Sequence, residues 1–440
     1  MSRSFGRALV FFLFPAAAAS AQDARALFNE GVELLQRGQD EEALRKFQDV
    51  LAADPTQEVA YQLWKETDHA VWLKLLVKGG EFEKIGRRLS DLASIGRKER
   101  RDDPEAIAAL VEKLKGDSAS RREAVLQLAS DHGEYAVPRL LQAAANPDEP
   151  DFALYATSAL IQLSGAAVLP LCEAARSDSA LVRRVAATVL GRIRDRRALG
   201  RLRRLAEADP DPSAKKASTE ALATLRAQPG SARDAFLEAG RGYLGLDGGE
   251  IRAIDLSEVV WRWQDGTLAK VPVPRMYYPL ELARGCFYDA LECDPSAAEA
   301  MVGTAYTYAG QLASLESLRL SGADIAPVEG AATRLAEGAV PLGACGPSIL
   351  DGALQWALKR DDGAVAVALI EAMGSSGGPS KTVVAALNEQ DKRVRYAAAI
   401  ALGNAMPEGS VSGLEAVPGT LAAAVAEDVA RIVHVIDENP

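Results

Sequence analysis

Nine arginines within 22 residues form a dense group of side chains able to bind anions. Among them, Arg197, Arg201 and Arg204 have the i, i+4, i+7 spacing that predicts one stripe along a helix face. Guanidinium groups bind carboxylates and phosphates through paired, charge-assisted hydrogen bonds. The cluster is therefore a candidate basic patch for an acidic protein segment, an anionic polymer or a phosphorylated ligand. The other members are Arg183, Arg184, Arg192, Arg194, Arg196 and Arg203, with Asp195 as the acid among them.

A structural interpretation of the same arginines stays open. Arg183 and Asp195 would stabilise the scaffold, and the remaining arginines would form a solvated face paired with neighbouring acids. Nucleic acid is not an expected ligand, because the chain has a formal charge of −11 and the basic region lacks interleaved aromatic residues.

Two tryptophans form the second candidate binding surface. Residues 259–272 alternate β-forming side chains around Asp265-Gly266, a dipeptide typical of a type I′ hairpin turn. Trp261 and Trp263 would share one face of that hairpin. They either anchor a partner, as buried aromatic residues do at interfaces, or pack this short insertion onto the helices.

The sequence contains no constellation that predicts catalysis. His69, His132 and His434 are isolated, and no zinc-protease, CxxC, GxSxG or phosphate-loop motif is present. Acid pairs such as Glu41-Glu42 lie at predicted helix starts, where they interact with the helix dipole. We expect no enzyme activity, no cofactor and no metal site; an unrecognised active site in the poorly patterned segment 313–362 is the alternative.

The four cysteines are expected to be free thiols. Cys286 and Cys293 lie seven residues apart on one predicted helix, which places them about 10 Å apart, beyond the roughly 7 Å that a disulfide allows. Cys172 and Cys345 are distant in sequence and surrounded by small or apolar residues.

The N-terminus has the layout of a secretory signal peptide. Arg3 and Arg7 precede an apolar run over 8–14, and Ala19-Ser20-Ala21 forms a small-residue cleavage site. We expect cleavage after Ala21 and a periplasmic or cell-envelope location. The apolar run is too short to cross about 30 Å of hydrocarbon, and no later segment predicts a membrane span.

A helical motif repeats through the middle of the chain. Residues 182–199 read V-R-x-x-A-A-x-x-L-G-x-I-x-D-x-R-A-L, and related Ala-x-x-x-Leu cores begin at Ala124, Ala156, Ala186 and Ser218, in steps of 32, 30 and 32 residues. The predicted partner helices cover 105–114, 137–145, 168–175 and 198–208, with Pro138 and Pro170 in first turns.

This pattern resembles the HEAT repeat, in the short form named after phycobilisome lyases. The resemblance implies stacked helical pairs and does not by itself imply lyase activity. The motif returns at 394–403, which predicts a second HEAT-like block.

Two other segments resemble tetratricopeptide (TPR) repeats. In the first, Gly31 and Ala43 allow two helices to approach, Phe47 fills the space between them, and Asp54-Pro55 ends the second helix. Leu34 and Gly38 complete that spacing, and a helix over 56–78 carrying Trp64 and Trp72 is expected to cap the pair. The second unit, residues 232–312, is split by an insertion over 247–280.

These patterns predict an all-α solenoid of mixed TPR and HEAT-like repeats with a small β-hairpin insertion. The expected parts are a signal peptide (1–21), a TPR unit with capping helices (22–100), HEAT-like repeats (101–228), a split TPR unit (229–315), a second HEAT-like block (316–425) and a strand-like tail (426–440). The tail resembles the first strand of a receiver domain, although the rest of such a domain is missing.

The chain thus resembles exported bacterial HEAT-repeat proteins with TPR units. That resemblance implies a non-catalytic scaffold or adaptor that binds a protein or peptide on its concave surface. An envelope module that binds an anionic polymer or lipid head group through the arginine-rich helix is the alternative.

Overall fold

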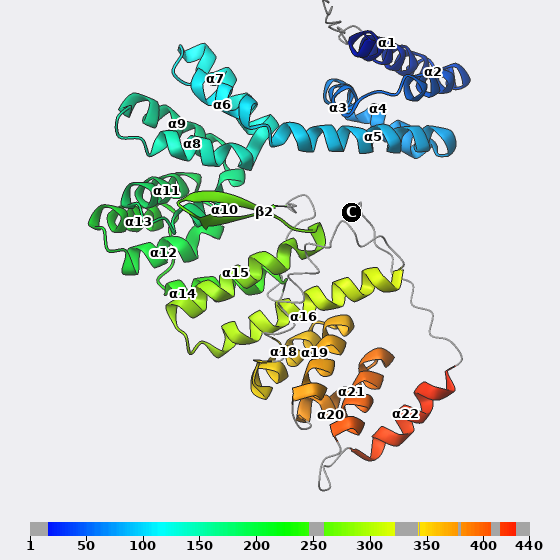
Figure 1. Cartoon of the computed structure of the whole chain (residues 1–440), viewed down its shortest axis with the longest axis vertical. Helices are drawn as coiled ribbons and strands as arrows, with labels where there is room; N and C mark the ends of the chain where they lie inside the picture. Colours follow the sequence, from blue (N-terminus) through cyan, green and yellow to red (C-terminus); the bar gives the residue numbers. More distant parts are fainter. Residues whose placement is uncertain are drawn as a thin grey trace, which may run out of the picture. The chain divides into compact units, whose positions relative to one another are not determined.

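A computed structural model describes residues 16–245, 259–321, 342, 344–376, 380–405 and 414–427 (Figure 1). Regular structure in these ranges is helical apart from one two-stranded sheet, which confirms the all-α solenoid with a β-hairpin. The chain forms two compact units, residues 1–140 and 141–440. Residues 1–15 of the predicted signal peptide and the tail from 428 onward lie outside the described residues, so both interpretations remain predictions.

The first unit is a succession of helices. Their bounds are α1 Ala16–Gln36, α2 Asp40–Ala52, α3 Gln57–Glu66, α4 His69–Lys78, α5 Gly80–Arg101, α6 Pro104–Lys113 and α7 Ser118–Gln127, followed by a π-helical turn Leu128–His132 and a 3₁₀ turn Gly133–Ala136. Helix α8 (Val137–Ala144) spans the boundary between the units.

Helices α1 and α2 pack as the predicted TPR spacing requires. Phe47 is fully buried between them, and a side chain at Gly31 would bring its Cβ to 2.9 Å from the Phe47 ring. Asp54 adopts a positive φ of 46° just before Pro55, so the chain leaves the helix where the sequence predicts. The assignment of this pair to the TPR family stays a prediction.

The single helix predicted over 56–78 is wrong. Helix α3 ends at Glu66, and a new helix, α4, begins at His69 because the side chain of Asp68 accepts a hydrogen bond from the backbone N–H of Ala70. Trp72 is buried and stacks on Phe28 at 5.2 Å. Trp64 is half-buried and lies against Tyr61, so the two tryptophans do not share one helix face.

The HEAT-like cores of the second unit form as predicted. Its first helices are α9 Pro150–Gln162, α10 Gly165–Ala174, α11 Ala180–Ile193, a 3₁₀ turn Arg196–Ala198, α12 Leu199–Ala208 and α13 Pro212–Thr224. Ala156, Ala186 and Ser218 are fully buried. One detail differs: α10 begins at Gly165, so Pro170 lies inside the helix rather than in its first turn.

The predicted hairpin is confirmed. Strands β1 (Val259–Gln264) and β2 (Thr267–Pro272) are antiparallel, and Asp265 and Gly266 both have positive φ, 50° and 76°, as a type I′ turn requires. The insertion separates α14 (Ala232–Tyr243) from the 3₁₀ turn Arg275–Tyr277 and α15 (Tyr278–Cys293).

Helices α14 and α15 nevertheless pack closely together, and α16 (Ala298–Ser321) follows them. Phe287 fills the space between these helices: Cβ atoms at Gly240 and Gly303 would lie 2.5 and 2.4 Å from its ring. The hydrophobic core of this region continues into the last helices, which are α18 Pro347–Lys359, α19 Gly363–Ser376, α20 Lys381–Ala386, α21 Lys392–Ala405, a 3₁₀ turn Leu414–Ala416 and α22 Val417–Ala426.

Helix α19 includes Gly374 and continues to Ser376. Gly374 lies close to α21, since a Cβ there would lie 3.3 Å from the Ala401 side chain.

Candidate functional site

The predicted arginine stripe does not form one exposed face. Arg201 is only 6% exposed and donates from Nη2 to both carboxylate oxygens of Asp289, at 2.8 and 2.7 Å, so its interpretation as a surface residue is wrong. Arg197 bonds Asp195 at 2.7 Å and the Gly165 carbonyl at 3.0 Å. Arg204 is half-buried on α12. The three arginines do not share an exposed face because side chains of α14 and α15 cover part of α12. One of these is Phe236, whose ring lies 5.3 Å from the Arg201 guanidinium.

The tryptophans of the hairpin have different environments. Trp261 is 5% exposed and belongs to the buried side of the insertion, which favours the packing interpretation for that residue. Trp263 is half-buried, and its backbone N–H donates to Glu173 of α10 at 3.3 Å. The hairpin thus lies against α10, and β1 also contacts α15 (Figure 1).

Asp289 is the centre of an ion-pair network that joins the HEAT-like helices to α15. It binds both Arg201 of α12 and Arg176, which follows α10. Arg176 also lies 3.2 Å from Glu292 and 3.4 Å from Glu173. Each of these arginines therefore has at least one carboxylate partner.

A second network lies between the hairpin, α15 and α16. Arg284 donates to Glu281 and to the Gln311 side chain, the latter at 2.7 Å, and Gln311 donates to Glu281 at 2.8 Å. Arg262 of β1 lies 3.7 Å from Glu281 and donates to the Trp261 carbonyl at 3.1 Å. The hairpin is therefore tied to the helices by charge as well as by packing.

These networks form the walls of a groove of about 740 Å³. We call it the hairpin groove. Its aromatic members are Trp263, Tyr288 and Tyr308, and its charged members are Glu173, Arg176, Arg262, Glu281, Arg284 and Glu292. Tyr288 is 43% exposed, and its hydroxyl lies 2.7 Å from that of Tyr308. The groove has equal numbers of positive and negative groups.

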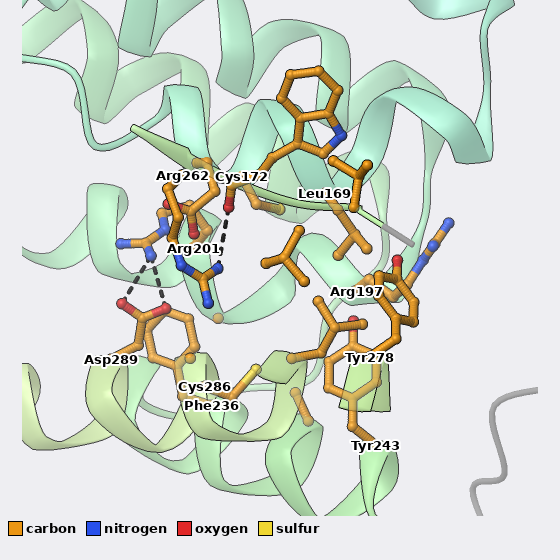
Figure 2. Close-up of a pocket in the computed structure, with 18 residues that line it drawn as sticks. Leu169, Cys172, Arg197, Arg201, Phe236, Tyr243, Arg262, Tyr278, Cys286 and Asp289 are labelled. Atoms are coloured by element: carbon orange, nitrogen blue, oxygen red, sulfur yellow. Dashed lines mark hydrogen bonds and ion pairs between the residues drawn. The ribbon is translucent and has the colours of Figure 1, made fainter. Parts of the chain in front are cut away.

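A smaller cavity of about 60 Å³ lies between α10, α12, α14, α15 and β1 (Figure 2). Glu173, Arg262 and Gly285 line both this cavity and the hairpin groove, so the two spaces adjoin. Apolar side chains such as Phe236 and Leu282 supply much of the cavity wall.

Two thiols, Cys172 and Cys286, also line the cavity and are free. Burial raises the pKa of Cys172 to about 12 and raises the pKa of Cys286 as well. Both thiols are therefore protonated at neutral pH, whereas the thiolate is the nucleophilic form.

The described residues provide little other reactive chemistry. The histidines among them, His69 and His132, both belong to residues 1–140, so the described residues around the groove include no imidazole. No group of three or more potential metal ligands was found in the part of the chain that the structure describes. Within the same ranges, no helix is long and apolar enough to cross a bilayer.

The sequence did not identify most residues of this site. Arg176 and Asp289 are 113 positions apart, and neither belongs to a motif that marks a binding site. Of the binding residues that the sequence predicts, Arg197, Arg201 and Trp261 line the cavity, Trp263 lines the groove, and Arg204 lines neither.

Comparison with known proteins supports one class of protein. Residues 168–239, from α10 into α14, match the family of HEAT repeats. Together with the helical fold, this match supports a HEAT-repeat protein built as a solenoid.

One curated relative is phycocyanobilin lyase subunit beta of Thermosynechococcus vestitus, 37% identical over 111 residues. The aligned stretch covers 25% of this chain and 52% of that protein, so the chain spans about half the length of the relative.

Proposed function

We propose that this protein is a non-catalytic helical-repeat scaffold that binds a segment of another polypeptide in the hairpin groove. The observation that carries the proposal is the composition of that groove. Partly exposed aromatic rings lie beside charged groups that already have partners. Aromatic anchors of this kind supply much of the binding energy at protein interfaces.

The balance of charge favours a polypeptide over an anionic polymer or lipid head group. Arg176, Arg262 and Arg284 each lie within 4 Å of a carboxylate of the same groove. An anionic ligand at Arg262 or Arg284 would have to displace Glu281, whose side chain is only 9% exposed, and leave it buried and unpaired at a cost of several kcal/mol. The envelope module for an anionic ligand is therefore the less favoured hypothesis.

A lyase-subunit role is the second candidate, because of the 37% identity to phycocyanobilin lyase subunit beta. Against it stand the buried, protonated thiols Cys172 and Cys286. Mixing the purified protein with phycocyanobilin separates the two functions. A shifted absorbance spectrum that is lost when groove residues are changed would favour the lyase role.

The location of the protein belongs to this proposal too. From the predicted signal peptide we infer export to the periplasm or cell envelope. Fractionation of the native cells and N-terminal sequencing test this inference: a mature N-terminus at Gln22 is expected, and a cytoplasmic chain that retains residues 1–21 would contradict it.

Site-specific photo-crosslinking in the native cell tests the groove directly. A benzoylphenylalanine replaces Tyr288, and a matched probe replaces Lys216, whose side chain is 78% exposed on α13. We expect the probe at 288 to give a discrete adduct with another polypeptide, and the probe at 216 to give none.

Irradiation of a cell extract adjusted to about 0.5 M salt is expected to give the same adduct yield at 288 as irradiation at low salt, because screening weakens exposed charge contacts more than apolar ones. The same adducts at both positions, or none at 288, would contradict binding in the groove.

A further inference from the structure

The free edge of β1, beside the hairpin groove, is not open to an added strand. Residues that flank a two-residue turn such as 265–266 bond each other, so the outward backbone groups of β1 belong to alternate residues, Trp261 and Trp263. The Trp263 N–H donates to Glu173 at 3.3 Å, and the Trp261 carbonyl accepts a bond from Arg262 at 3.1 Å. A polypeptide that extended the sheet would have to break both bonds.

The lining of the groove does not favour a helix or a charged group as its ligand. An amphipathic helix binds by its apolar face in an apolar groove. Leu291 is the only aliphatic side chain among the described residues that line this groove. A phosphate or a terminal carboxylate would need a free cation, whereas Arg176, Arg262 and Arg284 each lie within 4 Å of a carboxylate.

The groove instead provides hydrogen-bond donors next to aromatic rings. The indole N–H of Trp263 has no hydrogen-bond partner among the described residues, and it is not buried as the unpartnered indole N–H of Trp72 is. The hydroxyls of Tyr288 and Tyr308 lie 2.7 Å apart, so one donates to the other. The accepting hydroxyl keeps its own proton, which it can donate to a ligand. A ligand that carries free acceptors and few donors would match these groups.

A proline-rich segment in the polyproline II conformation has this chemistry. The conformation has no internal hydrogen bonds, so its carbonyls are free to accept, and proline has no N–H to donate. Aromatic side chains are the usual lining of grooves that bind such segments, and the preformed conformation loses little entropy on binding.

We propose that the hairpin groove binds a proline-rich segment of its partner in the polyproline II conformation. The Trp263 indole N–H and the Tyr288–Tyr308 hydroxyl pair donate to backbone carbonyls of the segment, and the three rings pack against its prolines. This proposal rests on the proposed function and specifies the kind of polypeptide that the groove recognises.

Decaproline is the probe for a first test with the full-length protein. Nuclear magnetic resonance spectra of the tryptophan indole N–H groups follow its titration. We expect decaproline to shift the Trp263 signal and to leave unchanged that of Trp356, which packs against the core of the same unit. A glycine–serine peptide of the same length should bind at least about tenfold more weakly, because it carries an N–H at every residue and is flexible.

Equal affinity for the two peptides would overturn the proposal. So would a Trp263 signal that decaproline at millimolar concentration does not shift.

Two substitutions each remove one donor and keep an aromatic ring. Trp263→Phe and Tyr288→Phe should each weaken the binding of fluorescently labelled decaproline about tenfold, the effect of losing one hydrogen bond of roughly 1.4 kcal/mol. Tyr396→Phe is the matched control, because it removes a hydroxyl that bonds Glu427 outside the groove. It should bind decaproline like the wild-type protein. Wild-type affinity in both groove variants, measured by fluorescence anisotropy, would contradict the assigned donors and overturn the proposal.

The native partner provides the closing test. The full-length protein carries a photo-crosslinker at Gln264, an exposed groove residue, so that Tyr288 is retained. We expect mass spectrometry to map the adduct to a segment with clustered prolines, and decaproline added to the extract to lower the adduct yield.

The two proposals fail in different ways. An adduct that maps to a segment without proline, or a yield that decaproline does not lower, would overturn only the polyproline II segment. The absence of any adduct at both 264 and 288 would refute polypeptide binding in the groove and the inference that rests on it.

Discussion

Arg183 of α11 and Arg395 of α21 occupy the same position in two copies of the V-R-x-x-A-A-x-x-L-G motif. Both donate from Nη1 to the backbone carbonyls five and six residues earlier, Arg183 at 2.9 Å to each and Arg395 at 2.8 and 2.7 Å. The two arginines differ in the hydrogen bonds of their other guanidinium nitrogens, Nε and Nη2. Arg183 also donates from Nε and Nη2 to Asp209, at 2.7 and 2.8 Å.

The second copy lacks an equivalent buried pair among the described residues. Glu427, which follows α22, is bonded by Lys392 at 2.9 Å and by the Tyr396 hydroxyl at 2.8 Å. Its side chain is 35% exposed, whereas that of Asp209 is 1% exposed. The carbonyl contacts are local to each repeat, while the buried carboxylate comes from the next helix pair. The same motif can therefore support either a tightly joined repeat or a loosely joined one.

The glycines of the two motifs differ in the same way. A Cβ at Gly191 would lie 2.6 Å from the side chain of Ala221 and 2.8 Å from its Cα. At Gly403 the nearest atom is a methyl group of Leu421, at 3.9 Å. Close approach of the following helix makes glycine necessary in the first repeat and not in the second.

The largest expected difference concerns the arginines. Arg183→Ala leaves Asp209 buried without its partner and should cost about 3–5 kcal/mol of unfolding free energy. Arg395→Ala removes only hydrogen bonds to carbonyls and should cost about 1–3 kcal/mol. Hydrogen exchange of α11 and α21 peptides measures each loss locally. Equal losses in the two variants would contradict the comparison.

Alanine substitutions of the two glycines should differ less than the two arginine variants, and their effects on stability should have opposite signs. Gly191→Ala crowds α13 and is expected to cost about 1–3 kcal/mol. Gly403→Ala should be neutral or stabilising by up to about 1 kcal/mol, because alanine favours the helix. Thermal unfolding of the two variants and the wild-type protein measures these changes in stability. A stabilised Gly191→Ala variant would contradict the close approach of Ala221 to Gly191.

A pH dependence should follow from the Arg183–Asp209 pair. Burial raises the pKa of Asp209, but the hydrogen bonds from Arg183 and from the backbone N–H of Asp211 outweigh it, and the net effect lowers that pKa. A carboxyl group whose pKa is lower in the folded state stabilises the protein above its unfolded pKa of about 3.9. That stabilisation is lost as the pH falls through the folded pKa.

The stability difference between the wild-type protein and Asp209→Asn should therefore shrink as the pH is lowered from about 5 toward 2. Urea unfolding across that range measures it, with Gly403→Ala as a variant whose difference should not change with pH. A constant difference for Asp209→Asn would contradict the assigned pKa direction.

The smallest effect is expected at Glu427. Its bonds to Lys392 and Tyr396 are solvent-exposed, so Glu427→Gln should change stability by less than about 1 kcal/mol. A loss as large as that of Arg183→Ala would mean that α22 is joined to α21 as firmly as the first block is joined internally.

Much of the fold could be predicted because it depends on local patterns. Ala186 and Leu190 are spaced to lie on one helix face, and both are buried. Asp265 and Gly266 both adopt the positive φ that a type I′ turn needs, and the hairpin forms around them. The helix predicted over 56–78 is divided in the structure because the side chain of Asp68 caps a new helix, which is a local signal as well.

The candidate site was far less predictable. The sequence determined which residues form helices, where the hairpin turns and which faces are apolar, because these depend on side chains a few positions apart. Only the tertiary structure decided that Arg201 is buried against Asp289 and that Arg176 binds the same carboxylate, 113 residues away in sequence. The i, i+4, i+7 spacing gave the arginines a common helix face but carried no information about which distant helix would cover it.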